Sequence, residues 1–454
     1  MSNQGQTNIE SVDGAIHPSS YIIEQALLFP SNKTEPVEFR DLILDLNIIE
    51  SLSNPFIEAE AFLQDAGNFL SRLRLNGNER IKLKLQRRKM EGSEQPDENQ
   101  KWELDLIATE LYDYSRTKPS RQFYKLRMNS PHLVINSSKS LKRIFDGSLT
   151  SIISGIIKND LQVPVHRLAD INEGSGGSVK GIYPYLSPIK AANWLLNNAY
   201  DEETPFFFYE TCFKGVYLQS LNDMYNKNSG EPYKTYELKS FFEHKVGSPE
   251  HYDELAHRIL KFSSPINYSQ NANVISGAYA AKGNFLDIFN KTYKPVEYRY
   301  SDNKKLNEFQ PFSKNDKIND QTLNNLIESR EYYINLNPGA FDNGSNIHTP
   351  LNSTVLRGEA HYLALNTNTM EIVLNGDFGL EVGNVIKLDV SKASSADQID
   401  EFNMFDKYLG TKYLVQKIES NFGEAFKQRV TIVRDSVGID IDSKEPEEVE
   451  RNEA

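Results

Sequence analysis

The stretch of sequence that decides the fold class is Leu46–Leu85, which reads LNIIESLSNPFIEAEAFLQDAGNFLSRLRLNGNERIKLKL. Apolar and polar residues alternate along Ile57–Leu63 and again along Arg80–Leu85. Turn-forming residues separate these runs at Ser53–Pro55 and Asn76–Asn78. A period of two with one polar face is typical of strands in antiparallel sheets. The stretch therefore predicts an antiparallel sheet or barrel.

The same pattern extends outward from this stretch and returns towards the other end of the chain. Nearby, it covers Leu42–Ile48, Trp102–Ala108 and Tyr124–Met128. In the later part we expect strands at Ile275–Ala281, Val296–Tyr300, Leu356–Leu365, Met370–Leu374, Val382–Val390, Tyr413–Ile418 and Phe426–Val433. The 23 Tyr and 24 Phe also favour strands over helices. We therefore predict two β-rich blocks.

Between the two blocks the pattern changes to helices mixed with a hairpin. Ser148 is suited to cap a helix, because apolar residues recur after it at helical spacing. A second helix is predicted from Ser187-Pro188, since proline fits the first helical position. The run Pro205–Leu221 predicts a β-hairpin that turns near Lys214-Gly215. The middle of the chain is therefore expected to be α+β.

These changes of pattern divide the chain into seven segments. We expect a flexible N-terminal arm at 1–19, a first tube-like β-barrel domain at 20–137, an α+β insert domain at 138–249, the first part of a second β-barrel domain at 250–300, a loop or insert region at 301–353, the remainder of the second barrel at 354–437, and a disordered acidic tail at 438–454. The predicted class is thus mainly β with an α+β insert.

Composition narrows the classes of function. The formal charge of −13 and a pI near 5.3 disfavour a general nucleic-acid binder, and the mixed basic and aromatic run Arg116–Arg127 is only a weak signal for one. The single cysteine, Cys212, excludes multi-cysteine metal sites and, within an apolar run, predicts a buried small side chain. No apolar run approaches the roughly 20 residues of a membrane span, and Met1–Glu10 lacks the features of a signal peptide. We expect a soluble protein, made in the cytoplasm, that has no cofactor.

Three features could carry chemistry, and each has a simpler explanation. His251 and His257 are not spaced at i and i+4, so a helix would place them on different faces. The loop 174–178 lacks the Gly-Lys-Ser/Thr that a phosphate cradle needs. Glu58 and Glu60 share the polar face of a strand, where acids are common. We therefore predict a non-enzymatic protein with no catalytic, cofactor-binding or metal-ligating residues.

Two stretches resemble the barrels of baseplate central hub proteins from contractile-tailed bacteriophages. In Leu46–Leu85, the matching positions are a strand ending in aspartate at Ile57–Asp65, a short helix near Gly67–Leu70, and Leu75, Gly77, Glu79 and Ile81. In Gly379–Asp435 they are Leu380, Gly383, Ile386, Tyr413, Val415, Ile418, Phe422, Val430, Ile432, Arg434 and Asp435. Ser420 departs from the family pattern, where histidine is common. Ser187–Leu221 resembles the insert that phage hubs share with the amino-terminal half of type VI secretion spike proteins.

The resemblance implies a homotrimeric ring, in which two related barrels per subunit give six quasi-equivalent barrels. Such a ring would join a sixfold tail tube to a threefold spike, in the baseplate of the virion tail, and would form part of the channel for DNA delivery. The implied partners are further copies of the chain, a central spike protein with an OB-like domain, tail tube or tube-initiator proteins, baseplate wedge proteins and, as a further candidate, the tape-measure protein, with DNA only as passing cargo. Arg434 and Asp435, at the end of the last strand, are candidate interface residues through an ion pair. The alternative for this pair is a solvated strand end.

Three other functions remain open. A hub or spike component of a type VI or extracellular contractile injection system is expected to continue into an OB-like domain and a needle, whereas this sequence ends in an acidic segment. A cell-wall hydrolase on a β-scaffold needs a buried carboxylate pair in a cleft, and no pair in the sequence stands out. A receptor-binding adhesin usually shows repeats or a fibrous segment, which the sequence lacks.

Overall fold

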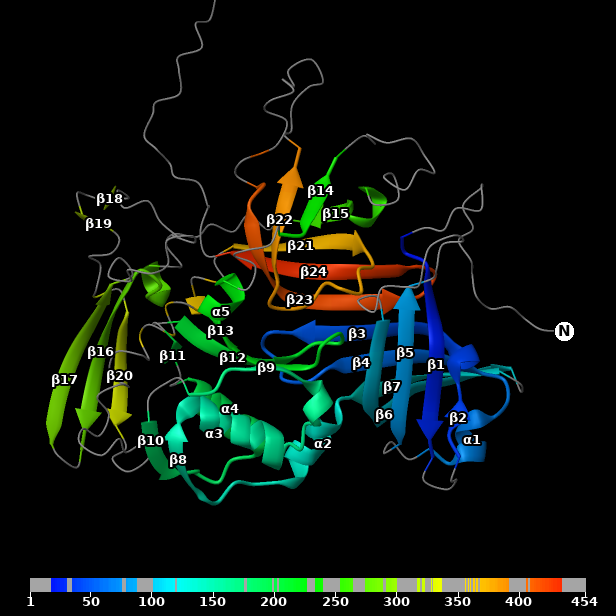
Figure 1. Ribbon diagram of the computed structural model, residues 1–454, viewed down its shortest axis with the longest axis horizontal. Helices are drawn as coiled ribbons and strands as arrows, with labels where there is room; N and C mark the ends of the chain where they lie inside the picture. Colours follow the sequence, from blue (N-terminus) through cyan, green and yellow to red (C-terminus); the bar gives the residue numbers. More distant parts are fainter. Residues whose placement is uncertain are drawn as a thin grey trace, which may run out of the picture.

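The computed structural model describes residues 18–30, 35–75, 79–87, 101–118, 121–174, 178–197, 200–201, 204–226, 233–239, 254–263, 274–288, 291–299, 317–318, 321–322, 328, 330–336, 356, 358, 360, 362–363, 365, 368–391, 406 and 409–434 (Figure 1). Most of these residues lie in β-strands, and most strand pairs are antiparallel. The predicted class, mainly β, is therefore confirmed.

The largest unit is a 13-stranded sheet with strands from both ends of the chain. Its first block consists of β1 (Tyr21–Phe29), β2 (Val37–Glu38), β3 (Ile43–Ser51), β4 (Glu58–Asp65), β5 (Arg80–Arg87), β6 (Lys101–Lys118) and β7 (Arg121–Asn129), with the 3-10 turn η1 (Arg40–Leu42) and helix α1 (Phe69–Leu73). Its second block consists of β14 (Thr235–Leu238), β15 (Ile259–Ser263), β21 (Asn368–Asn375), β22 (Val385–Val390), β23 (Lys412–Phe422) and β24 (Phe426–Arg434). Burial alternates along β4 and β5, which confirms the period of two in the sequence.

One pair of strands, here called the seam, joins the two blocks. β3 pairs antiparallel with β23, from Ser51 opposite Lys417 to Leu46 opposite Phe422. On the other side of each strand lies its own hairpin partner, β4 or β24. Figure 1 shows β21, β24, β23, β3 and β4 stacked side by side across the middle of the molecule. The two blocks therefore form one continuous sheet.

The expected pair of separate barrels is not formed within the described residues. A barrel requires the strand path to return to its own first strand. Here the seam leads the path out of one block and into the other, so that it runs from β15 to the short strand β2 without closing. The seven-segment division of the chain stays a prediction.

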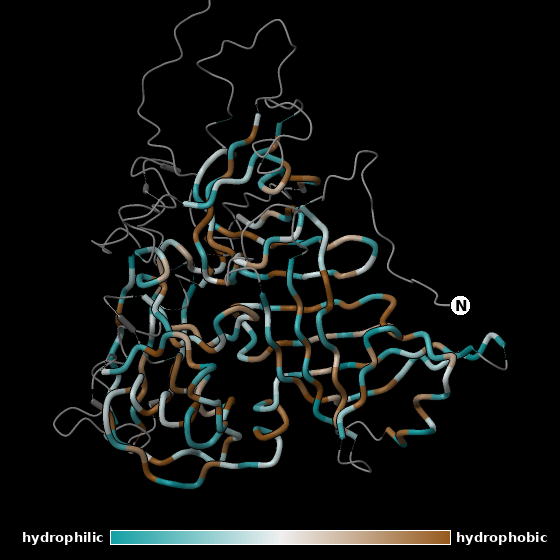
Figure 2. Tube along the Cα trace, turned by 45° about the vertical axis from the view of Figure 1, so that its right-hand side comes forward, coloured by the Kyte–Doolittle hydropathy of each residue, from teal (hydrophilic) through white to brown (hydrophobic). Residues whose placement is uncertain are grey.

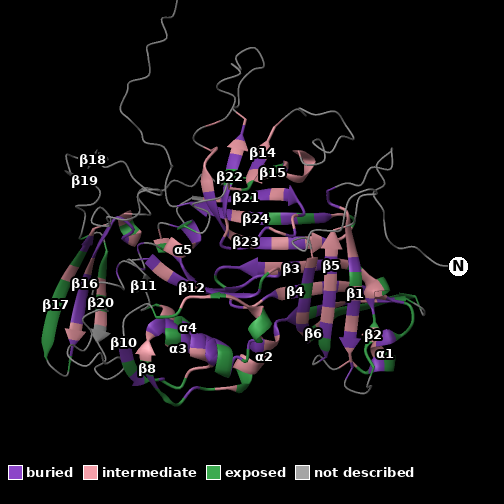
Figure 3. Cartoon of the chain, viewed as in Figure 1, coloured by how far each residue is buried: buried purple, intermediate pink, exposed green. Residues whose placement is uncertain are grey.

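Aromatic side chains fill the core where the blocks meet. Trp102 of β6 packs edge-on against Phe378, Phe422 and Phe426, with ring centroids 4.9, 5.9 and 6.0 Å away. Its indole N–H donates to the carbonyl oxygen of Phe378 at 2.8 Å, so the only polar atom of the ring is satisfied. All four rings are buried, and Figure 3 shows buried positions along the strands on both sides of the seam. Their packing stabilises the contact between the blocks.

The insert lies below the seam in Figure 1 and combines helices with two small sheets. Its helices are α2 (Pro131–Ser138), α3 (Leu149–Gly155), the π-helix η3 (Ile156–Asp160), the 3-10 turn η4 (Val165–Arg167), α4 (Pro188–Leu196) and α5 (Leu221–Asn226). One sheet pairs β8 (Ile144–Ser148) with β10 (Ser178–Ile182), and the other contains β9 (Leu168–Ile171), β11 (Tyr200–Asp201), β12 (Thr204–Glu210) and β13 (Val216–Ser220). The Ser148 side chain accepts from the Ser151 backbone N–H, which confirms the predicted cap. β12 and β13 form the predicted hairpin.

Two expected strands are wrong in whole or in part. Every described residue within 356–365 is helical, and the buried Leu356 and Ala360 are four residues apart, a spacing that fits a helix as well as an alternating strand. The segment Ile275–Ala281 begins as a helical turn, and strand structure starts only at Ala280. From there β16 (Ala280–Asp287) forms a three-stranded sheet with β17 (Thr292–Arg299) and β20 (Glu331–Leu336), outside the second block. A separate pair is formed by β18 (Lys317–Ile318) and β19 (Gln321–Thr322).

The expected flexible arm is described only at its end. There Ser19 is buried, its hydroxyl donates to Asn375 Oδ1 at 2.7 Å, and its carbonyl oxygen accepts from the Phe426 N–H at 2.9 Å. The expected loops at 302–321 and 337–352 lie mostly outside the described residues, and the acidic tail lies wholly outside them. Among the helices that the structure describes, none is long and apolar enough to span a membrane.

Candidate functional site

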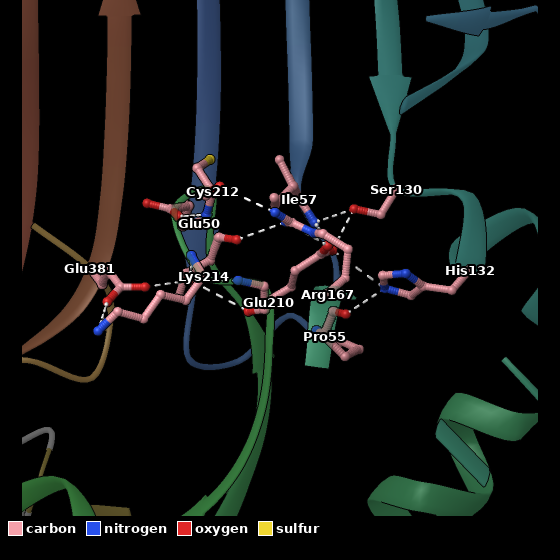
Figure 4. A network of polar contacts seen from close by, with 12 residues as sticks. Glu50, Pro55, Ile57, Ser130, His132, Arg167, Glu210, Cys212, Lys214 and Glu381 are labelled. Atoms are coloured by element: carbon pink, nitrogen blue, oxygen red, sulfur yellow. Dashed lines mark hydrogen bonds and ion pairs between the residues drawn. The ribbon is translucent and has the colours of Figure 1, made fainter. Parts of the chain in front are cut away.

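A cluster of polar side chains is buried where the insert meets both blocks (Figure 4). We call it the junction network, and it consists of Glu50, Ser130, His132, Arg167, Glu210, Thr211, Cys212, Lys214 and Glu381. Its three carboxylates, Glu50, Glu210 and Glu381, are only 2%, 5% and 3% exposed. Carboxylates are rarely this buried unless they are paired or hydrogen-bonded. The network is therefore the candidate site.

The β12–β13 hairpin supplies most of the network from the insert. β12 ends at Glu210, and the turn that follows is closed by the Thr211 N–H, which donates to the Gly215 carbonyl oxygen at 2.8 Å. Gly215 has a φ of +112°, and a Cβ there would lie 2.2 Å from the Arg167 carbonyl oxygen. Only glycine fits this close approach. The turn and Arg167 are thus held against each other.

Glu210 ties the insert to the first block. Its Oε2 accepts from the Ile57 backbone N–H at 3.2 Å and from the Ser130 hydroxyl at 2.5 Å. Its Oε1 accepts from Arg167 Nη2 at 3.1 Å, and His132 Nε2 lies 3.6 Å from Oε2. Every oxygen of this carboxylate therefore has a donor, as a buried charge requires.

Glu50 makes fewer contacts and lies deeper. The Cys212 backbone N–H donates to its Oε1, whereas its Oε2 has no hydrogen-bond partner within the described part of the chain. Burial raises the pKa of Glu50 from 4.5 to about 8; Glu381 raises it further, while the Cys212 N–H and Arg167 act in the opposite direction. Glu50 is therefore mainly a neutral acid at pH 7. Cys212 is fully buried, as expected, and burial raises the pKa of its thiol, which makes it unreactive.

Glu381 connects the second block to the same hairpin. Its Oε1 accepts from the Thr211 hydroxyl at 2.7 Å and from the Tyr217 hydroxyl at 3.4 Å. Lys214 Nζ lies 3.5 Å from its Oε2. One hairpin of the insert thus contacts carboxylates from both blocks through adjacent residues.

The geometry of the network is that of a structural joint. Its carboxylates are closed off from solvent, and its cations are Arg167, partly buried, and the half-exposed Lys214. Buried ion pairs fix a geometry more than they add net stability. In the described ranges, no group of three or more His, Cys, Asp or Glu side chains is placed to hold a metal ion.

Sequence reasoning missed this network, although a signal for part of it was present. Leu42, Leu44, Leu46 and Ile48 share one face of their strand, and Glu50 is the next residue in that phase. Glu210 likewise continues the phase of Phe206 and Phe208. A carboxylate in phase with a core face is a sign of a buried polar contact. Its partners could not be read from the sequence, because they lie in other segments.

The candidate interface pair is only partly described. Arg434 is 1% exposed, its Nη1 donates to Thr411 Oγ1 at 2.6 Å, and its guanidinium lies 4.9 Å from the Tyr413 ring centroid. Asp435 lies outside the described residues. The ion pair and its interface role therefore stay predictions.

The carboxylate pair, the histidine pair and the loop 174–178, which we do not interpret as catalytic or binding sites, have ordinary surroundings where the structure describes them. Glu60 accepts from the Tyr112 hydroxyl, and Glu58 accepts from Asn54 Nδ2 at 3.3 Å. His257 lies with its ring centroid 5.8 Å from that of Tyr236, and its expected partner His251 lies outside the described residues. Most of the loop 174–178 lies outside them as well.

The solvent face of the first block carries a second set of charges, here called the outer ladder. It contains the ion pairs Arg80–Asp105, Lys84–Glu103, Lys101–Glu103, Lys101–Glu24, Lys125–Glu60 and Arg127–Glu110. Basic side chains of β5 face acidic side chains of β6 across the strands. The ladder is therefore close to electrically neutral along its length.

Comparisons with known proteins give no sequence match and several structural ones. No family model and no curated protein matches the chain. A tail protein from Neisseria meningitidis MC58 is 9% identical, with a TM-score of 0.49, over 92% of this chain and 97% of that one. The 43 kDa tail protein of prophage MuSo2 from Shewanella oneidensis is 9% identical, with a TM-score of 0.47, over 92% and 99%. A type VI secretion system component from E. coli is 9% identical, with a TM-score of 0.44, over 90% and 76%.

By their descriptions, two of these structural neighbours are tail proteins and the third is a type VI secretion system component.

Proposed function

We propose that the chain is a structural subunit of the baseplate hub in a contractile phage tail, where three copies form a ring between the tail tube and the central spike. The observation that carries the proposal is the seam. The two stretches that resemble hub barrels, Leu46–Leu85 and Gly379–Asp435, lie far apart in the sequence, yet they hydrogen-bond directly through β3 and β23. One subunit therefore contributes two adjoining blocks of a single continuous sheet.

The open ends of the sheet support assembly between copies. Within the described residues, its main path stops at β15 on one side and at the two-residue strand β2 on the other, and a side branch through β22 ends at β14. Unpaired strand edges favour pairing with another chain. Three subunits, each with two blocks, would place six blocks around one axis, which suits a sixfold tube on one side and a threefold spike on the other.

The junction network gives this ring a mechanical role without catalysis. It fastens the insert to both blocks, so that a load on one part is passed to the others. Its carboxylates are too buried to meet a polysaccharide, which favours the hub over the hydrolase. The outer ladder presents paired charges, a surface on which passing DNA would not be held.

The remaining parts of the proposal concern partners and place. We propose the tail baseplate of a virion as the location, and the spike protein, tube or tube-initiator proteins and wedge proteins as neighbours. Arg434 and Asp435 are proposed to contribute to one of these contacts. The barrel-like closure of the blocks is proposed to be completed only between subunits.

The test is the molar mass of the purified chain, measured by light scattering alone and after mixing with a candidate spike protein. A trimer of 51.8 kDa subunits under either condition is the expected result. A monomer under both conditions overturns the proposal. An assay on purified cell walls runs in parallel, and release of soluble sugar by the purified chain would favour the hydrolase instead.

A further inference from the structure

One end of the first block carries a cluster of exposed cations, here called the basic end. It is formed by Arg116, Lys118 and Arg121 at the tip of the β6–β7 hairpin and by Arg72 and Arg74 in and beside α1, all exposed. Figure 2 shows the hairpin tip as a hydrophilic projection beyond the rest of the sheet. The projection exists because β5 pairs with β6 only as far as Ile107, while β6 continues to Lys118.

A buried carboxylate holds the two parts of the basic end together. Asp65 is 1% exposed, and its Oδ2 accepts from Gln122 Nε2 at 2.6 Å and from the Leu70 N–H at 3.2 Å. Its Oδ1 accepts from the Gly67 N–H at 2.9 Å. The start of β7 and the start of α1 are therefore fixed to the same side chain, which makes the basic end a defined surface.

The hairpin tip places like charges opposite each other. Lys118 and Arg121 are direct cross-strand partners. Lower on the same hairpin, Glu110 stands opposite Arg127 and forms an ion pair with it at 2.5 Å. Opposed like charges destabilise a strand pair, whereas opposite charges support it. A bound anionic group between the two cations would remove this repulsion.

Asp113 of the same hairpin is already engaged, because its Oδ2 lies 3.4 Å from Lys125 Nζ. The basic end is thus a concentration of positive charge on a chain whose formal charge is −13. An acidic peptide segment is complementary to this surface in charge.

The chain contains a segment that matches the basic end in charge. Between Asp440 and Glu453 there are seven acidic residues, Asp440, Asp442, Glu445, Glu447, Glu448, Glu450 and Glu453, against Lys444 and Arg451. We propose that the basic end binds this acidic C-terminal segment of a neighbouring copy. The inference rests on the proposed ring, because the ring would bring the segment of one subunit close to the next and raise its effective concentration.

Zero-length carbodiimide crosslinking of the full chain tests the inference, since it joins a lysine only to a carboxylate in direct contact. A mixture of unlabelled and ¹⁵N-labelled chains, assembled together, separates links between copies from links within one copy. Links from Lys118 to carboxylates within 440–453, between differently labelled copies, are the expected result. Their yield should fall at least about threefold at roughly 0.5 M salt, where screening shortens to about 4 Å.

Matched variants make the result specific. Glu447→Lys with Glu448→Lys should reduce the links from Lys118, while Lys142→Glu with Lys190→Glu, which changes two exposed lysines of the insert, should leave them unchanged. Equal linking of the segment to Lys118, Lys142 and Lys190, or links only within one copy, overturns the inference.

Light scattering distinguishes a failure of the proposed docking of the acidic segment from a failure of the proposed trimeric ring. A trimer without Lys118 links overturns only the docking of the segment, whereas a monomer without them overturns both proposals. Binding of a fluorescent single-stranded DNA oligonucleotide that is lost in Lys118→Glu with Arg121→Glu would assign the basic end to nucleic acid and would also overturn the inference.

Discussion

The outer ladder and the junction network are built from the same residue types, and they differ in almost every physical respect. In the ladder, Arg80 and Asp105 pair with side chains that are 56% and 38% exposed. In the network, Arg167 and Glu210 pair with side chains that are 18% and 6% exposed. Water and dissolved salt strongly screen the attraction between Arg80 and Asp105. They screen the attraction between Arg167 and Glu210 only weakly.

This difference in exposure shows on which ion pairs the stability of the molecule depends. If one partner of an ion pair in the outer ladder is replaced, the remaining charge is still solvated. In the junction network, removal of one member leaves a buried charge without its counterpart. Three predictions test this contrast.

Replacement of Arg167 by alanine should have the largest effect. It leaves Glu210 with one cation fewer and removes donors to the carbonyl oxygens of Thr211 and Cys212. We expect a loss of about 3 to 5 kcal/mol in the free energy of unfolding, measured by urea titration with tryptophan fluorescence. Arg80→Ala serves as the control. Equal losses in the two variants would show that burial does not distinguish the two sites.

Replacement of Glu50 by glutamine should change the pH dependence of stability. The folded-state pKa of Glu50, about 8, lies above its ordinary value of 4.5, so the folded protein holds a proton that the unfolded chain releases. The contribution of Glu50 to the free energy of unfolding is fully present below pH 4.5. It declines by about 1.4 kcal/mol per pH unit between pH 4.5 and pH 8. Glu50→Gln should remove this decline.

The control for Glu50 is Glu371→Gln, which changes an exposed glutamate of β21. Urea midpoints measured from pH 5 to pH 8.5 should fall in parallel for wild type and the control and stay flatter for Glu50→Gln. Parallel curves for all three proteins would mean that Glu50 is ionised in the folded state.

A double-mutant cycle on Arg80 and Asp105 should show the smallest effect. Both side chains are more than a third exposed, so the coupling free energy is expected to be below about 1 kcal/mol. It should shrink further between about 0.05 and 0.5 M salt. A coupling above about 2 kcal/mol that resists salt would place the ladder in the same class as the network.

Local features of the fold could be predicted wherever one pattern dominates. Strict phase in β4 and β5, the cap at Ser148 and the proline that begins α4 all depend on neighbouring residues, and each is confirmed. The continuation of β6 to Lys118 was missed, because bulges after Ala108 and Tyr112 break the alternation that marks a strand.

The candidate site was harder to predict than the strands. Glu50, Glu210 and Glu381 meet only because the seam and the β12–β13 hairpin bring three segments together. The phase of Glu50 and Glu210 indicates burial, but long-range pairing leaves no periodic trace in a single sequence. Burial of Glu50 could be suspected from its phase, but the absence of a partner for its Oε2 among the described residues could not.

The seam also sets an order of events during synthesis. The hairpin β3–β4 leaves the ribosome before the insert is made, whereas β23 follows only after the insert. Until then the outer edge of β3 has no partner, and such edges are prone to pair with other chains. Contacts between segments so distant in sequence also form slowly. A nascent chain therefore cannot complete its central sheet before β23 has been translated, which delays assembly until both blocks are present.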